Sequence, residues 1–542
     1  CKKRRTATVR KEKRLLQGLV TAVAVAIPTG TQAQQQPNII LFMVDDMGWQ
    51  DTSVSFWTQR TLLNDTYETP SMERLAREGM LFSQAYAAPI SSPSRCSLMT
   101  GCNAARHRVT NWTLRRDEST DIDDPVVRTP EWNYNGITQQ TITTQQPSPT
   151  TQQQTITTQH PTPATHVFSA RTFVDILRAN GYHTIHVGKA HWGALDTPGE
   201  RPEHFGFEVN IAGHAAGGPA TYLSERNYGH DADGNATSPM ATPGLHKYWQ
   251  TGTFLTEALT KECLAALDTA KQTGKPFYLY MSHYAVHIPI DRDQRYYQKY
   301  RDKGLSEKEA AYAALIEGMD HSLGEILQWL DDNNLARNTV VIFMSDNGGY
   351  ATGSYYRDEP LYTQNAPLRS GKGSLLEGGI REPMMVRWPG VVKEGSRCDS
   401  YVMIEDFYPT ILEMAGINSY RVPQTVDGRS FMPLLRQTGD PSRRRALVWN
   451  FPNVWGNTGP GISLNCAIRQ DEWKLIYNYK TGEKELYNID RDISETHNLA
   501  SERPDVVKRL SRRLGRQLRK MKAQRPFFKA TGLPCPWPDE KR

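Results

Sequence analysis

The chain has 542 residues, 38% of them hydrophobic and 23% charged, and is long enough to bury a large core and to form two or more domains. Its formal charge of +6 would by itself favour a nucleic-acid or membrane partner. Eight lysine and arginine residues stand against one glutamate in the first 14 residues, so the chain from Gln34 onward carries a net charge of −1. We therefore expect no nucleic-acid partner.

Residues 1–33 have the pattern of a secretory signal peptide. A basic start is followed by an apolar run, Leu15 to Ile27, and by small residues like those at a signal-peptide cleavage site. A membrane anchor is the alternative, but the run is too short to span a bilayer and contains Gln17 and Gly18. We expect an exported protein, periplasmic or secreted, with no stable membrane insertion.

The chain contains seven cysteines, and none of them shows the CxxC or Cys/His spacing of a metal site. Six would remain after loss of a leader. An oxidising compartment would allow them to form disulfides, although the sequence cannot pair them.

The first predicted strand, Ile39 to Val44, is apolar throughout, as a buried parallel strand should be. It ends in Asp45-Asp46, at the edge where open α/β sheets bind their ligands. Two adjacent carboxylates without a basic neighbour repel each other and favour a hard divalent cation. The alternative is an ordinary polar turn.

A serine-rich stretch, Ser-Ser-Pro-Ser-Arg-Cys-Ser-Leu-Met-Thr-Gly, runs from Ser91 to Gly101 after a predicted strand at 80–86. A chain that enters a helix here would present free backbone N–H groups to an anion. The alternative is a loop whose serines merely cap the helix.

Residues 110–132 are polar, rich in Trp and Arg, and are predicted to form an irregular segment over the site.

Residues 138–163 contain mostly Gln, Thr and Pro, and the hexapeptide at 140–145 recurs at 154–159. No apolar periodicity supports a packed core in this second stretch. We predict a disordered surface insertion, with a structured binding arm as the alternative.

Helices are expected after the capping residues Thr69, Thr172 and Ser306. Three further apolar strands are predicted, each followed by polar residues. Gly188-Lys189-Ala190-His191 follows the strand at 184–187, His283 and His287 follow the strand at 276–281, and Asp346-Asn347 follows the strand at 339–344. Gly371-Lys372 lacks the spacing of a phosphate-binding Walker A loop.

The composition changes near residues 436–445. Short alternating strands follow at 467–470, 473–478 and 484–487. A basic amphipathic helix is predicted from Asp505 to Met521, and its Lys/Arg run is most simply a solvated face.

The stretch at Ser91 resembles the defining motif of the type I sulfatases: Cys or Ser, any residue, Pro, Ser or Ala, Arg, and a helical run that closes on Thr-Gly. In that family the first residue is oxidised to formylglycine (3-oxoalanine), which here would be Ser91. Further elements resemble the family in the family's order over about residues 37–500. They are Gly188 to His191, His287 before x-Pro, Asp346-Asn347, Gly371-Lys372 and Glu377 to Pro383.

The resemblance implies the alkaline phosphatase-like α/β fold, with a large mixed, mostly parallel sheet flanked by helices and a small C-terminal antiparallel sheet with a helix. It divides the chain into a signal peptide (1–33), a catalytic domain (34–440) that carries the insertion, and a C-terminal subdomain with a tail (441–542).

The resemblance also implies the site. The catalytic residues would be Ser91, Arg95, Lys189, His191, His287 and Lys372, and the metal ligands Asp45, Asp46, Ser91, Asp346 and Asn347. This oxygen-only set suits Ca²⁺, or less well Mg²⁺, and not zinc. The three cations would spread positive charge around the nucleophile and the sulfate, and His191 or His287 would protonate the departing alcohol. His283 has no counterpart in the motif and is expected to be structural.

The implied function is that of an exported sulfuric ester hydrolase. Serine at position 91 resembles bacterial enzymes that an iron–sulfur radical maturase modifies in the cytoplasm before export. Trp112, Trp132, Trp192 and several arginines would suit a sugar ring, which favours a sulfated glycan as substrate. The alternatives are a phosphomonoesterase or phosphodiesterase that uses unmodified Ser91, and a non-enzymatic binder of sulfated glycans.

Overall fold

The computed structural model describes residues 36–140, 164–351, 353–354 and 365–541. The predicted signal peptide and most of the predicted disordered insertion lie outside this part of the chain. Thr138 and Gln139, the first residues of the insertion, belong to strand β4 (Ile137–Gln139), which pairs with β5 (Phe168–Ala170). The prediction of disorder is wrong for these two residues, because β5 offers their backbone a hydrogen-bonding partner.

The central sheet is mixed and mostly parallel. Its strands are β1 (Asn38–Val44), β2 (Met80–Tyr86), β6 (His183–Gly188), β7 (Val209–Ile211), β8 (Phe277–Ser282), β9 (Thr339–Ser345), β11 (Arg381–Arg387), β12 (Ser396–Cys398) and β13 (Val402–Met403). Their order is β12-β2-β11-β9-β1-β8-β6-β7, and β13 also pairs with β2. β9, β1, β8, β6 and β7 run parallel, whereas β11 is antiparallel to both β9 and β2.

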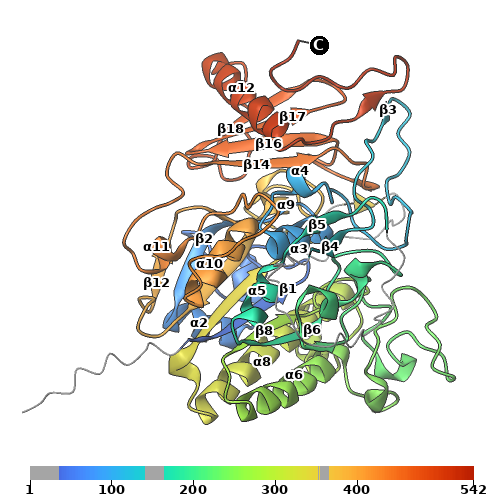
Figure 1. The fold of residues 1–542 in the computed structure, drawn as a ribbon, viewed down its shortest axis with the longest axis vertical. Helices are drawn as coiled ribbons and strands as arrows, with labels where there is room; N and C mark the ends of the chain where they lie inside the picture. The colour runs from blue at the N-terminus through green and yellow to red at the C-terminus, as the bar shows by residue number, and fades with distance from the viewer. Residues whose placement is uncertain (1–35, 141–163, 352, 355–364, 542) are drawn as a thin grey trace, which may run out of the picture. The chain divides into compact units, whose positions relative to one another are not determined.

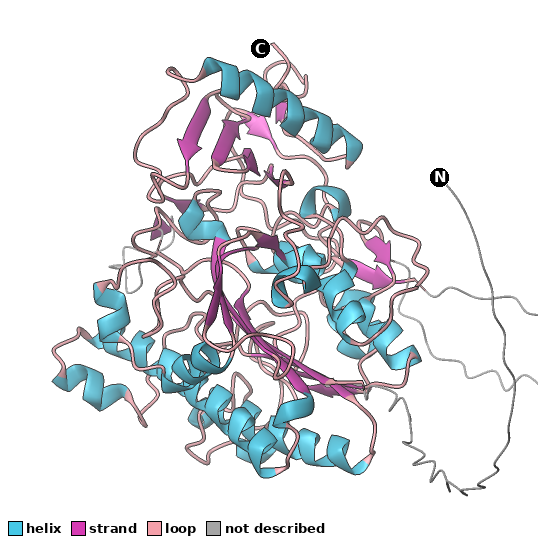
Figure 2. Ribbon diagram, turned by 90° about the vertical axis from the view of Figure 1, so that its left-hand side faces the viewer, coloured by secondary structure: helices cyan, strands magenta, loops and turns pink. Residues whose placement is uncertain are grey.

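Helices cover both faces of this sheet (Figure 2). One face packs against α2 (Pro70–Glu78), α6 (Leu255–Gln272), α7 (Tyr297–Asp302) and α8 (Glu307–Asp332), and the other against α3 (Ser91–Thr100), α5 (Phe173–Ala179), α10 (Phe407–Met414) and α11 (Met432–Leu435). β1 supplies Ile40 and Phe42 to the first core and Ile39 and Leu41 to the second. This double burial explains why β1, β8 and β9 are apolar throughout and do not alternate.

A small antiparallel sheet follows near the C-terminus, with its helix on one face (Figure 1). Its strands are β14 (Ala446–Phe451), β16 (Asn465–Gln470), β17 (Trp473–Asn478) and β18 (Lys484–Asn488), in that order, and the helix is α12 (Pro504–Lys520). Leu510 and Leu514 of α12 pack on this sheet. The opposite face packs Trp449 and Ile476 against Ile90 at the start of α3.

The predicted α/β architecture is therefore confirmed, although β14 was not among the predicted strands. Ser306 caps α8 in a capping box, and Thr172 caps α5, as expected. The six cysteines of the described residues are all free. Among the same residues, no helix is both long and apolar enough to cross a membrane.

Candidate active site

The parallel strands β1, β6, β8 and β9 end at one edge of the sheet, and the polar residues that follow them converge there. Ser91 is the first residue of α3, and Lys372 lies in the loop before α9 (Glu377–Ile380). All of the predicted site residues are brought to this edge: Asp45, Asp46, Ser91, Arg95, Lys189, His191, His287, Asp346, Asn347 and Lys372. Residues as far apart in the sequence as Asp46 and Lys372, 326 positions, thus form one site.

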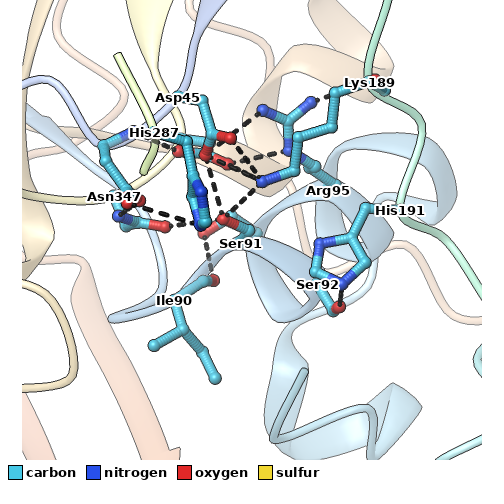
Figure 3. A network of polar contacts seen from close by, with 12 residues as sticks. Asp45, Ile90, Ser91, Ser92, Arg95, Lys189, His191, His287 and Asn347 are labelled. Carbon is cyan, nitrogen blue, oxygen red and sulfur yellow. Dashed lines mark hydrogen bonds and ion pairs between the residues drawn. The ribbon is translucent and has the colours of Figure 1, made fainter. Parts of the chain in front are cut away.

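Ser91 lies at the centre of this group (Figure 3). Its Oγ is 3.0 Å from Nζ of Lys189, 3.0 Å from Oδ1 of Asn347 and 3.2 Å from Oδ1 of Asp45. The side chain is buried but lines a cavity. Ser91 therefore faces the cavity on one side and a cluster of charges on the other.

Three buried carboxylates form an acidic cluster behind Ser91. One oxygen each of Asp45, Asp46 and Asp346 can be chosen so that all three lie within 4.8 Å of one another. Burial raises the pKa of Asp45. It also acts to raise the pKa of Asp46, but Lys372 and His287 outweigh it and lower that pKa.

Asn347 completes an oxygen-only set of possible metal ligands. Its Nδ2 donates to Oδ1 of Asp46 at 2.8 Å, which turns its Oδ1 toward Ser91. Buried carboxylates and an amide carbonyl are the donors that Ca²⁺ and Mg²⁺ prefer. With neither thiolate nor imidazole among these four residues, the donor set fits a hard divalent cation.

Three cations balance the carboxylates. Nζ of Lys189 lies 2.8 and 2.7 Å from the two oxygens of Asp45, and Nζ of Lys372 lies 2.6 and 2.8 Å from those of Asp46. Nε of Arg95 donates to Oδ2 of Asp346 at 2.7 Å. Burial opposes a low pKa for Asp346, yet Arg95 and Lys189 hold its pKa below the usual value.

The three cations differ in their access to ligand. Lys372 lines the cavity, whereas Arg95 and Lys189 are fully buried behind Ser91. Arg95 is fixed in place by Oγ of Ser282, to which its Nη1 donates at 2.6 Å. Of the three, only Lys372 can therefore contact an anion in the cavity directly, and the charge of the other two acts through the carboxylates and Ser91.

Two histidines line the cavity. Nδ1 of His287 bonds to the carbonyl of Ile288 at 2.7 Å, which leaves Nε2 3.7 Å from Oδ2 of Asp46. Nε2 of His191 is 3.0 Å from both Oγ of Ser92 and the carbonyl of Thr113, and its buried Nδ1 has no hydrogen-bond partner. Burial lowers the pKa of both imidazoles, that of His287 to about 3.

His283 is structural, as expected. It is fully buried, and its Nε2 bonds to Oγ of Ser322 on α8 at 2.8 Å, away from the cavity. Burial lowers its pKa to about 3.

The cavity above Ser91 has a volume of about 270 Å³ and aromatic walls. Trp112, Tyr350 and Trp455 line it, and Nζ of Lys372 lies 5.9 Å from the ring centres of both Tyr350 and Trp455. A lysine cation at the bottom of the cavity and aromatic rings on its walls suit a ligand that combines an anionic group with a ring.

The structure corrects two of the three tryptophans predicted to face a sugar. Trp132 and Trp192 are buried in the core on the α3 side of the sheet, where Trp192 stacks on Phe207. An aromatic ring packs in a core as readily as on a sugar, and the sequence does not show the direction of the side chain. Trp112 alone of the three lines the cavity, and the sequence analysis missed Trp455 and Tyr350.

Comparisons with known proteins agree with this geometry. The family model described as Sulfatase matches residues 37–417. The chain belongs to the sulfatase family. A second model, N-sulphoglucosamine sulphohydrolase, C-terminal, matches residues 371–524, which contain the small antiparallel sheet. The family identifies the reaction as sulfate ester hydrolysis.

The chain is similar to individual sulfatases over nearly its whole length. It is 29% identical to a sulfatase of Formosa agariphila, over 90% of this chain and 88% of that one. It is 27% identical to the human N-acetylgalactosamine-6-sulfatase, over 89% of this chain and 84% of that one. The crystal structure of Ps i-CgsB superposes with a TM-score of 0.68 at 26% identity, over 89% and 93% of the two chains.

Proposed function

We propose that this sulfatase removes sulfate from sulfated glycans with Ser91, after conversion to formylglycine, as its nucleophile. We further propose that Asp45, Asp46, Asp346 and Asn347 hold a Ca²⁺ ion beside it. The observation that carries the proposal is the position of Ser91 Oγ, which lies within 3.2 Å of a lysine, an amide oxygen and a carboxylate at the base of a cavity.

The conversion to formylglycine would give the site a stronger nucleophile than an unmodified serine. A serine hydroxyl is a weak nucleophile unless a base activates it, and no imidazole bonds to Ser91 Oγ in the described part of the chain. The hydrated aldehyde would supply one hydroxyl for attack on sulfur and a second to expel sulfate afterwards. Lys189 and Asn347 would orient these hydroxyls, since both already lie 3.0 Å from Oγ.

The metal would supply positive charge at the point where the sulfate oxygens gather. Asp45, Asp46 and Asp346 would hold it, while Arg95 and Lys189 keep these carboxylates ionised and in place. Lys372 would donate to a sulfate oxygen from the cavity wall. The site without metal is balanced, with three carboxylates and three cations, so a divalent cation leaves a surplus of positive charge for the sulfate.

Either cavity-lining histidine would protonate the leaving alcohol. His287 carries its proton on Nδ1 if that atom donates to the carbonyl of Ile288, whereas the bond of His191 to the carbonyl of Thr113 places its proton on Nε2. Burial disfavours the charged form of both imidazoles and so lowers the pKa of each, whereas a bound anion nearby would favour protonation. A proton handed to a leaving oxygen would therefore be released readily.

A sulfated glycan is the proposed substrate because aromatic faces stack on sugar rings, and Trp112 and Trp455 form such walls. Two relatives support this class. The name of one refers to N-acetylgalactosamine 6-sulfate chemistry, and Ps i-CgsB was also solved in complex with k-i-k-neocarrahexaose, again at 26% identity to this chain. We also propose export, guided by residues 1–33, and cytoplasmic modification by a radical maturase.

The test is to produce the protein with and without such a maturase and to assay one sulfate and one phosphate ester. We expect sulfate hydrolysis only with the maturase. Ser91→Cys should be active also in hosts whose aerobic maturase acts on cysteine alone. A phosphoesterase with unmodified Ser91 predicts the reverse: full activity in any host and a preference for phosphate.

A further inference from the structure

A second cavity adjoins the one above Ser91. It has a volume of about 670 Å³, and the two share Met240, His287 and Ile288 as lining residues. The two cavities therefore adjoin at these residues, and we describe them as two halves of one cleft. The first half contains the nucleophile, and the second contains none of the residues assigned to catalysis apart from His287.

A pair of glycines carries the backbone from one half to the other. A Cβ atom on Gly217 would lie 2.5 Å from Cε1 of His191, and one on Gly218 would lie 2.5 Å from Nδ1 of His287. Any side chain here would displace an imidazole from the cavity. The loop therefore packs directly against both histidines, and it lines the first half with Gly217 and the second with Gly218, Pro219 and Ala220.

The second half has the mixed lining of a carbohydrate site. Ile288, Pro289 and Ile290 provide an apolar surface, and Ser238 provides a hydroxyl. Oγ of Ser238 accepts from the backbone N–H of Met240 at 3.2 Å, so its own proton remains available to a ligand. Lys308, in the first turn of α8, adds a cation. Apolar contacts with a few placed polar groups and one charge suit a sugar ring with an anionic substituent.

We propose that this second half binds the neighbouring sugar of a sulfated glycan chain while the sulfated sugar occupies the half above Ser91. The proposal rests on the proposed function of the first half. The ring of the neighbouring sugar would lie on Ile288 and Ile290, a hydroxyl would meet Ser238, and a sulfate or carboxylate would meet Lys308. The preferred substrate is then at least a disaccharide.

The test compares 4-methylumbelliferyl sulfate, which has no second sugar, with oligosaccharides of two to six residues from carrageenan, chondroitin sulfate, heparan sulfate and fucoidan. Wild-type kcat/KM should rise at least about tenfold from the aryl ester to the best oligosaccharide. Ser238→Trp, which fills the second half, should lower the ratio of the two kcat/KM values about tenfold. Lys308→Gln should lower it severalfold through KM, and Lys308→Arg should restore it.

Lys393→Gln is the matched control, because Lys393 is an exposed lysine that lines neither half of the cleft. It should leave both kcat/KM values unchanged. Equal losses on the aryl ester and the oligosaccharide in Ser238→Trp, or no loss on either, would overturn the subsite. Cleavage of the aryl ester but of no glycan would overturn it too and leave sulfatase chemistry standing. Absence of any sulfate hydrolysis by matured wild-type protein would contradict the proposed function itself.

Discussion

Two buried clusters of charge in the described part of the chain differ in function, and only the first is a candidate active site. Behind Ser91, three carboxylates meet three cations. Between the central and the C-terminal sheet, Nζ of Lys474 lies 2.9 Å from both Glu377 and Glu495, and Tyr86 and Arg381 also bond to Glu377. Both clusters are nearly balanced in charge and almost fully buried.

Access to ligand separates the two clusters. Asp46, Ser91 and Lys372 line a cavity, whereas Glu377 and Lys474 are fully buried and line neither half of the cleft. The second cluster fixes the C-terminal sheet to the start of α9, because Lys474 of β17 bonds to Glu377, and the backbone N–H of Glu377 donates to Oε2 of Glu495 at 2.6 Å. A buried charge cluster therefore indicates function only where a ligand can reach it.

The largest expected effect is on activity in the first cluster. Ser91→Ala should lower kcat by at least about 10⁴-fold, because it removes the nucleophile. It should leave the melting temperature nearly unchanged, since one small polar group is lost. Ser97→Ala is the matched control, because Ser97 lies on the same helix and bonds to His107, away from the cavity. Sulfate turnover by Ser91→Ala near the wild-type rate would contradict this assignment.

Lys474 and Lys189 are expected to have different roles, the first in stability and the second in catalysis. Lys474→Met removes the cation that Glu377 and Glu495 share and leaves Arg381 as the hydrogen-bonded cation of Glu377. It should lower the free energy of unfolding by about 3–5 kcal/mol while kcat/KM below the melting temperature is retained. Lys189→Met should show the opposite pattern, with kcat/KM down by about 10²–10³-fold and a smaller loss of stability in Ca²⁺, which continues to neutralise Asp45. Denaturant unfolding and steady-state kinetics of the pair measure both. If Lys474→Met were as stable as wild type, the second cluster would not be structural.

The cluster behind Ser91 can be predicted from the sequence, whereas the cluster around Glu377 cannot. Asp45, Asp46 and Asp346 directly follow apolar strands, so their meeting at one sheet edge can be predicted from strand ends alone. Glu377, Lys474 and Glu495 come from a helix, a strand and a loop with no shared pattern, and their meeting depends on how the C-terminal sheet packs.

The aromatic residues that line the cavity above Ser91 were also hard to predict from the sequence. Trp455 lies in the loop after β14, a strand that the sequence did not indicate, and it reaches the cavity only through the packing of the C-terminal sheet. Trp132 and Trp192 were predicted to face a sugar, but they fill a core. The sequence thus indicates the chemistry at the base of the cavity, whereas tertiary packing decides its walls.

Metal removal should have an intermediate effect. Stripping the protein with EDTA should lower the free energy of unfolding, by about 2.7 kcal/mol relative to Ca²⁺ at 100 times its Kd, because the ion binds only the folded acidic cluster. Calorimetry with and without Ca²⁺ measures the shift, and Asp46→Asn should reduce it. Unchanged melting and activity after exhaustive dialysis, with no metal by elemental analysis, would remove the metal from the site.

The smallest effect concerns a buried carboxyl that belongs to neither cluster. Burial and the neighbouring Asp406 raise the pKa of Glu405 to about 7, and its Oε2 has no hydrogen-bond partner. The folded protein holds this proton more tightly than the unfolded chain, so stability should fall by about 1–3 kcal/mol as pH rises from about 4.5 to 7. Glu405→Gln should remove that part of the slope in denaturant unfolding at several pH values. An identical slope in both proteins would show that Glu405 is ionised in the fold.

The most direct test of the central claim is the mass of the tryptic peptide from Glu78 to Arg95, which carries Ser91. In protein produced with a radical maturase, the account predicts a shift of about −2 Da, the loss of two hydrogens on oxidation to the aldehyde. The shifted fraction should rise in step with sulfatase activity, and the peptide from cells without the maturase should be unshifted and inactive. An unshifted peptide from a preparation that hydrolyses sulfate esters at full rate would contradict the account.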